Sequence, residues 1–127
     1  MTVEILAEKH GDEERPVPTA WRSTFHRIVK SFIDKDYGLR QPIANVAPVS
    51  VETAQQVQDY IEDYGETLVE LPEHTWETSI CIWMGNGWDV HVDLWTEGEG
   101  RSDMVLSIRV VESNASLIFH LEMVYVP

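Results

Sequence analysis

The sequence predicts an α+β domain in which two N-terminal helices pack on one face of a four-stranded antiparallel meander. Apolar residues recur at three-and-four spacing between residues 19 and 65, which is typical of helices. After residue 77 they alternate with a period of two, in four segments joined by short turn-like links. Short links force neighbouring strands to run antiparallel, and helices followed by strands are typical of the α+β class.

The 127 residues are enough for one core without metal or disulfide support. We expect residues 19–127 to form this single domain, and residues 1–18 to form an arm and linker. Val3, Ile5 and Ala7 alternate like a short strand, so an extra edge strand is expected there. The charged, proline-broken stretch that follows reads as a linker.

Both helices carry start and stop signals. Thr19 is expected to cap the first helix and Gly38 to end it, whereas Ser50 caps the second and Gly65 ends it. Pro42 and other loop residues separate the two. The side chains expected to face the core are Trp21, Phe25, Ile28, Val29, Phe32 and Ile33 in the first helix, and Ala54, Val57, Ile61 and Tyr64 in the second.

The expected strands are residues 78–84, 88–96, 104–112 and 117–127, and the first hairpin between them has two candidate registers. A three-residue loop at 85–87 pairs Met84 with Trp88, which makes one face fully apolar. The opposite face then carries Asp89, His91 and Asp93 together with Trp83, Cys81 and Ser79. A two-residue Asn-Gly turn instead pairs Met84 with Asp89 and sets the acidic row among aliphatic side chains. We favour the three-residue loop, because burying one clean face is the stronger demand.

The last hairpin is predicted with a single register. Its pairs are Val110–Phe119, Ile108–Leu121, Leu106–Met123 and Met104–Tyr125, with Arg109 beside His120 and Ser107 beside Glu122 on the other face. The ionisable groups on the polar face of the sheet, which are the first candidates for a site, are therefore Asp89, His91, Asp93, Arg109, His120 and Glu122.

Metal binding by this row is disfavoured by spacing. Neighbours at i and i+2 on a strand lie about 6.6 Å apart, so Asp89 and Asp93 lie about 13 Å apart and cannot share one ion with His91. A site would need His120 or Glu122 from another strand. No phosphate loop, dinucleotide fingerprint, paired-cysteine motif or HExxH motif occurs, and the mid-strand Cys81 is expected to be inert. We therefore expect no metal, no cofactor and no catalytic residue.

Charge points to the kind of partner. Nine Lys and Arg against 22 Asp and Glu give a net charge of -13, which repels phosphate backbones and anionic lipids, so nucleic acid and membrane surfaces are not expected partners. A basic protein is the favoured partner. The candidate surfaces are the second helix around Asp59, Glu62, Asp63 and Glu66, and the sheet face at Asp89, Asp93 and Trp95.

A competing interpretation is that the two helices neutralise each other. Residues 50–73 contain no basic residue, whereas residues 19–40 contain five basic and two acidic ones. The N-terminus lacks a signal-peptide pattern, no window reaches the roughly 20 apolar residues of a membrane span, and the single cysteine fits a reducing compartment. A cytoplasmic location is the expectation.

The stretch "LPEHTWETSICIWMGNGWDVHVDLWTEGEGRSDMVL…VYVP" resembles a group of small bacterial proteins of unknown function with a Trp-rich hairpin and a C-terminal VYVP. This resemblance supplies no functional residue. The general style is similar to bacterial immunity proteins, and more loosely to the cone-shaped nuclear-transport-factor-like folds. The net charge and the lack of a catalytic motif lead us to expect a non-enzymatic protein-binding module, immunity-like or regulatory. The alternative is a small-molecule or enzymatic pocket that uses His91 and His120, and a third candidate is a homodimer through the sheet face or an edge strand.

Overall fold

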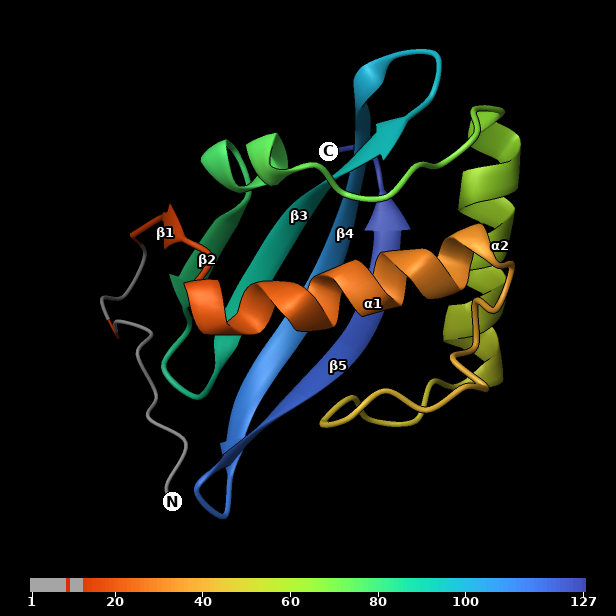
Figure 1. The fold of residues 1–127 in the computed structure, drawn as a ribbon. Coiled ribbons are helices and arrows are strands. Elements are labelled where there is room, and N and C mark those ends of the chain that lie inside the picture. The colour runs from red at the N-terminus through yellow and green to blue at the C-terminus, as the bar shows by residue number, and fades with distance from the viewer. Residues whose placement is uncertain (1–8, 10–12) are drawn as a thin grey trace.

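The computed structural model describes Lys9 and residues 13–127, which form one antiparallel sheet with one helix across its face and a second helix along one edge (Figure 1). The five strands lie in sequence order, so the sheet is a meander with a short extra strand at one edge. The predicted α+β fold class is confirmed. The strands are β1 Arg15–Pro16, β2 Ile80–Trp83, β3 Trp88–Thr96, β4 Gly100–Ser113 and β5 Ser116–Tyr125. The helices are α1 Arg22–Ile33 and α2 Val51–Tyr64, with short 3-10 turns η1 Thr19–Trp21 and η2 Glu73–Glu77.

The two helices cover the sheet in different ways. In Figure 1, α1 crosses the face of the sheet, and α2 stands beside β5. Aromatic rings join α1 to the strands, since Trp21 packs edge-on against Trp88 and Phe25 packs edge-on against Phe119. The predicted apolar stripe of the first helix is buried, except that Ile33 is only half-buried. On α2 the buried residues are Val57 and Ile61.

The helix ends were predicted correctly for α2 only. The Ser50 side chain accepts the Thr53 N–H at 3.1 Å, and Gly65 ends the helix with a φ of 82°. Thr19, in contrast, makes no side-chain cap, because the chain enters through a 3-10 turn after Pro18. The first helix also ends at Ile33, five residues before Gly38.

The early end of α1 has a local cause. Lys35 adopts a left-handed φ of 63°, and the N–H of Asp36 turns back to the carbonyl of Ser31 at 2.8 Å. This arrangement satisfies the last helix carbonyls without a glycine. The Asp36 carboxylate then accepts the backbone N–H groups of Gln41 and Arg40, which lowers the pKa of Asp36.

The first hairpin has neither of the two predicted registers. Its turn residues are Gly85 and Asn86, and the Met84 N–H closes the turn on the carbonyl of Gly87 at 2.8 Å. Gly85 has a φ of 92°, so the first glycine, not the Asn-Gly pair, supplies the positive φ that the turn needs. The cross-strand pairs are Trp83–Trp88, Cys81–Val90, Ile82–Asp89 and Ile80–His91.

This register moves residues between faces. Trp83 and Cys81 lie on the helix side and not beside Asp89 as the favoured register required, and Cys81 is buried. The acidic row instead neighbours Ile80 and Ile82, as the Asn-Gly alternative implied. This register leaves Asp89, His91 and Asp93 half-buried beside aliphatic side chains.

The last hairpin follows the predicted register only near its turn. Asn114 and Ala115 form a two-residue turn with positive φ at both positions, and Val110–Phe119, Arg109–His120 and Ile108–Leu121 pair as expected. A bulge then shifts the register, so Ser107 faces Met123 and not Glu122. The predicted pairs Leu106–Met123 and Met104–Tyr125 are wrong for the same reason.

Strand β4 also begins earlier than predicted. Residues 97–99 form the turn before it, so Arg101, Ser102 and Asp103 belong to the strand and not to a longer loop. The Ser102 hydroxyl donates to the carbonyl of Leu94 at 2.8 Å, and the register with β3 shifts in this region. The β3–β4 connection is therefore a tight turn whose charged residues stand in a fixed place.

Both edges of the sheet are partly covered. The edge strand β1 pairs with β2 through Arg15 and Pro16, whereas the predicted strand at Val3, Ile5 and Ala7 lies outside the described residues. On the β5 side, Asn45 and Ala47 exchange backbone hydrogen bonds with Phe119. The Gln56 side chain bonds to both backbone groups of Val124, and the Tyr60 hydroxyl accepts the Val126 N–H. Such cover blocks edge-to-edge pairing.

Candidate functional site

An acidic face forms where the C-terminal half of α2 meets the β3–β4 turn. The Tyr64 hydroxyl donates to Glu99 Oε1 at 2.7 Å and accepts the backbone N–H of Asp103 at 3.1 Å. The Glu97 N–H also donates to the carbonyl of Thr67. In Figure 1, the end of α2 and the β3–β4 turn lie at the same end of the molecule. The acidic face comprises Asp59, Glu62, Asp63, Glu66, Glu97, Glu99 and Asp103.

Glu66 is the link between the helix end and the turn. Its carboxylate lies directly against Gly98, where an added side chain would collide with it. The chain after Glu66 continues alongside the end of β3, since Leu68 and Thr96 form a bridge and the Val69 N–H donates to the carbonyl of Trp95. Carboxylates that are more than 30 positions apart in the sequence are thereby held on one surface.

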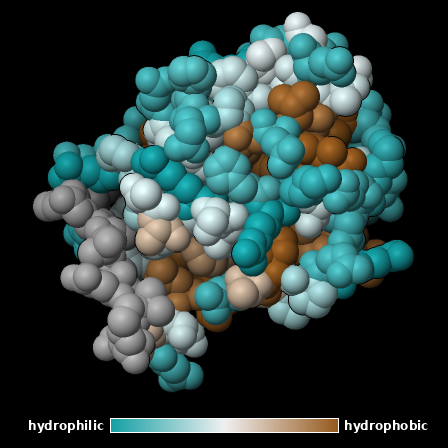
Figure 2. Space-filling view, viewed as in Figure 1, coloured by the Kyte–Doolittle hydropathy of each residue, from teal (hydrophilic) through white to brown (hydrophobic). Residues whose placement is uncertain are grey.

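The carboxylates of the acidic face have no basic partner among the described residues. No Lys, Arg or His nitrogen of Lys9 or residues 13–127 forms an ion pair with them. Asp59 and Glu62 instead accept amide hydrogen bonds from Gln55 and Gln58 on the same helix. Residues 41–127 contain fifteen acidic and only two Lys or Arg residues, so the full negative charge of the chain resides there. Hydrophilic residues line the α2 side of the molecule in Figure 2.

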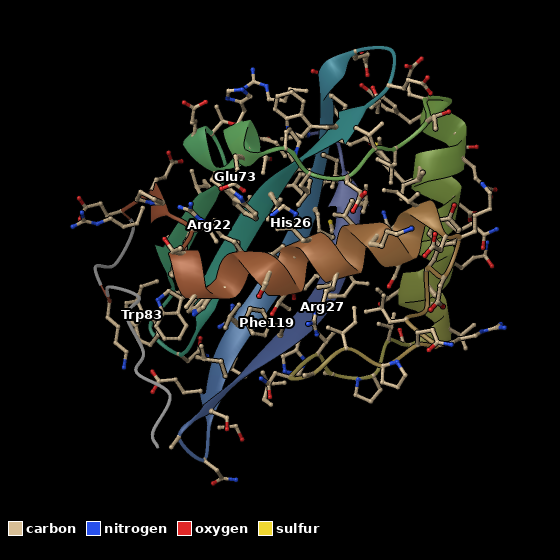
Figure 3. All side chains as sticks on the ribbon, in the orientation of Figure 1. Arg22, His26, Arg27, Glu73, Trp83 and Phe119 are labelled. Carbon is tan, nitrogen blue, oxygen red and sulfur yellow. The ribbon has the colours of Figure 1, made fainter. Side chains whose placement is uncertain are left out.

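The basic side chains of α1 are directed elsewhere. Arg22 lies over the Trp76 ring at 5.3 Å, and His26 Nε2 lies 3.8 Å from Glu73, so both meet η2 (Figure 3). Lys30 pairs with Asp34 on its own helix. Within the part of the chain that the structure describes, no ion pair joins α1 to α2. The interpretation that the helices neutralise each other therefore gains no support from direct pairing.

The pKa of Tyr64 is influenced by the carboxylates of the acidic face. The N–H of Asp103 lowers the pKa of the Tyr64 phenol by donating to its oxygen. The hydrogen bond to Glu99, partial burial, and the charges of Glu99 and Asp103 act in the opposite direction, and the net result is a raised pKa. The phenol therefore stays a hydrogen-bond donor to Glu99 well above neutral pH.

The second candidate surface is the sheet face opposite the helices. Asp89 and Arg109 form an ion pair there at 3.0 Å, with both side chains 27% exposed, and Arg109 also donates to the Asn86 carboxamide. His120 lies beside Arg109 and is exposed. Glu122, displaced by the bulge, is exposed as well. The Arg109 charge is thus already satisfied inside the protein.

His91 and Asp93 on the same face are also engaged. His91 Nδ1 lies 3.1 Å from the Tyr125 hydroxyl, which reaches it across the small Ser107. The Asp93 carboxylate accepts the Thr78 hydroxyl. Trp95 is half-buried, and its indole N–H has no hydrogen-bond partner among the described residues. His91 and Asp93 thus already have hydrogen-bond partners within the protein, so they are not free to bind a ligand.

The described residues hold no group of three His, Cys, Asp or Glu side chains placed to bind one metal ion. The hollows formed by described residues include three open ones of about 730, 300 and 470 Å³. The first lies between the loop after α1 and the start of α2, and the second between the ends of the two helices. The third lies on the open sheet face beside Asp93, Arg101 and Asp103. Neither His91 nor His120 lines any of them.

Several residues of the acidic face were missed by reasoning from the sequence. Tyr64 packs partly against the core, and Glu97 and Glu99 lie in a turn, both as expected, but the contact between the two segments was not foreseen. Asp103 was expected in the loop and instead belongs to β4. A usable signal was available, because no Lys or Arg occurs between Arg40 and Arg101. What the pattern could not supply was the tight turn that brings this segment against α2.

Fold and surface together define a small α+β domain with an acidic face and with no assembled metal centre in the part described. The chain belongs to the DUF7668 family, a domain of unknown function whose family model matches residues 29–127. No curated protein matches the chain significantly, and no solved structure does. None of the described helices is both long enough and apolar enough to cross a bilayer.

Proposed function

We propose that the protein is a non-enzymatic binding module that takes up a basic protein on its acidic face. The observation that carries this proposal is the contact between the acidic end of α2 and the acidic β3–β4 turn, made by Tyr64 with Glu99 and by Glu66 with Gly98, with no ion-pair partner for these carboxylates among the described residues. Like charges held together cost free energy unless a cation approaches them. A basic partner would supply that cation and would associate faster at low ionic strength.

The construction of the face supports binding more than solubility alone. Dispersed charges would keep the chain soluble, whereas here Tyr64 fixes Glu99 in place and Gly98 admits the Glu66 carboxylate. Fixed side chains lose less entropy when a partner docks. Such a surface suits an immunity-like or a regulatory module whose target presents a basic site.

The open sheet face and the pocket alternative have weaker support. Asp89 and Arg109 neutralise each other, and His91 is engaged with Tyr125. His91 and His120 face away from the helices, so they do not enclose a cavity of the nuclear-transport-factor type. Self-association through the open face remains the third proposal, since Met123 is 42% exposed there.

The proposal is tested by capturing partners from native lysate at low and high salt. The test variant is Asp59→Asn/Glu62→Gln/Asp63→Asn, which removes three charges without changing side-chain size. The matched control is Glu14→Gln/Glu73→Gln/Glu77→Gln, which removes the same charge from exposed positions outside the acidic face. We expect a basic protein that is captured at low salt by wild type and by the control, and is lost by the test variant. Equal capture by the two triple variants would contradict the proposal.

A further inference from the structure

A lysine side chain occupies an aromatic corner at the end of the sheet away from the acidic face. Lys9 Nζ lies 5.1 Å from the centre of the Trp83 ring and 5.9 Å from that of Trp88. The same ammonium lies 2.8 Å from Glu112 Oε1. Aromatic faces combined with a carboxylate are the groups that proteins use to bind ammonium and guanidinium ions. The corner therefore has the chemistry of a cation site.

The walls of this corner are rigid parts of the fold. Trp83 and Trp88 are cross-strand partners on β2 and β3, with ring centres 4.8 Å apart. Trp21 packs edge-on against Trp88 at 5.4 Å and joins the corner to the start of α1. Figure 3 shows Trp83 beside the N-terminal end of that helix. Glu112 lies near the end of β4, on the strand that pairs with β3. The sheet and the core thus position the walls.

Lys9 contacts the corner through its side chain. Its backbone makes no hydrogen bond to the other described residues, and its side chain is 49% exposed. Five residues separate it from Arg15 at the start of β1. A cation on so short a tether has an effective concentration in the millimolar range. Another cation that reaches a similar local concentration would compete with it.

We propose that Trp83 and Glu112, backed by the fully buried Trp88, form a recognition site for a lysine or arginine side chain of another protein, with Lys9 as a tethered occupant that closes the site in the free chain. The partner chemistry follows from charge complementarity, because the occupant in the structure, Lys9, is itself a primary ammonium. The match to the family covers all three wall residues, whereas Lys9 lies outside it. This site is separate from the acidic face and does not depend on it.

The test uses small probes on the full chain. The probes are N-acetyl-lysine amide, N-acetyl-arginine amide and, as the neutral analogue, N-acetyl-norleucine amide. Binding is followed by tryptophan fluorescence and by the indole N–H signals in NMR spectra of wild type and Lys9→Met. Methionine retains an apolar stem at position 9 and removes the charge. We expect Lys9→Met to bind the cationic probes at least about fivefold more tightly, because the tethered competitor is gone.

Three further measurements make the result decisive. Glu112→Gln in the Lys9→Met background should weaken binding of both cationic probes, and the norleucine probe should not bind. The acidic-face variant should bind the probes like wild type, so failure here is distinguishable from failure of the proposed function. Equal probe affinity of wild type and Lys9→Met, or equal binding of the neutral probe, would overturn the inference. Unchanged thermal unfolding of Lys9→Met would show that loss of folding does not explain the result.

Discussion

The Tyr64 hydroxyl is bonded to Glu99 Oε1 at 2.7 Å, and this bond joins the last turn of α2 to the β3–β4 turn. The same oxygen accepts the Asp103 N–H. One side chain therefore joins the end of α2 to two positions that lie 35 and 39 residues away in the sequence. It thereby holds the acidic end of the helix against the acidic turn.

Removing that hydroxyl should loosen the turn without unfolding the domain. Tyr64→Phe loses one hydrogen bond to a carboxylate and one from a backbone N–H, both on an exposed surface. We expect faster amide exchange at Asp103 and in residues 97–99. The free energy of unfolding should decrease by less than about 1 kcal/mol. Tyr60→Phe is the control, since its hydroxyl accepts the Val126 N–H and its loss should affect only the C-terminus. Unchanged exchange at Asp103 would argue against the role given to Tyr64.

Gln56 should matter for the β5 edge. Its amide donates to the carbonyl of Val124 at 2.6 Å and accepts the Val124 N–H at 3.1 Å, as a neighbouring strand would. Gln56→Ala leaves both backbone groups without these partners, and we expect the free energy of unfolding to fall by about 1–3 kcal/mol.

The control for Gln56 is the adjacent, exposed Gln55, which bonds only to Asp59 on its own helix. Gln55→Ala should change the free energy of unfolding by no more than about 0.5 kcal/mol. Denaturant unfolding measures both values. Sedimentation at two protein concentrations should also show self-association of Gln56→Ala alone, because its strand edge is uncovered. Equal behaviour of the two variants would be inconsistent with this reading.

Because Cys81 is buried, we expect the protein to lose stability at alkaline pH. Burial, together with the Asp89 charge, raises the pKa of the Cys81 thiol from 9.0 to about 12. The protonated thiol is favoured in the folded state, so its contribution is fully present below pH 9 and is lost as the pH rises from 9 towards 12. Cys81→Ala should flatten this part of the stability curve, measured by urea unfolding at several pH values between 8 and 11. Parallel curves for the two proteins would contradict it.

The elements of the fold could be predicted from the sequence because they rest on local patterns. The stripe from Trp21 to Phe32 has helical spacing, and the run from Trp88 to Thr96 alternates strictly, so each signals its own structure. Ser50 and Gly65 likewise act on the helix between them. The cap at Thr19 failed because Pro18 starts a 3-10 turn that no local signal announced.

The registers could not be predicted because several turns suit the same residues. Two glycines flank Asn86, and it is Gly85 that adopts the positive φ of the turn. The resulting register pairs Trp83 with Trp88 on the helix side of the sheet. The gain from packing the half-buried Trp83 against the buried Trp88 is a tertiary effect that no turn rule contains. The bulge near Glu122 is similar, since it lets Val124 reach Gln56 of α2. The part of the acidic face in residues 97–103 depends on tertiary contacts of this kind, so only its helical half was predicted.

The acidic face can be tested as the binding surface by measuring how fast the captured basic partner associates with purified wild type and with the two triple variants, at low and at high salt. We expect a rate that falls steeply with salt for wild type and for Glu14→Gln/Glu73→Gln/Glu77→Gln. For Asp59→Asn/Glu62→Gln/Asp63→Asn we expect a rate that is at least about tenfold lower at low salt and has a shallower salt dependence. If both triple variants lose the same rate and retain the same salt dependence, net charge alone governs association and the acidic face is not the binding surface.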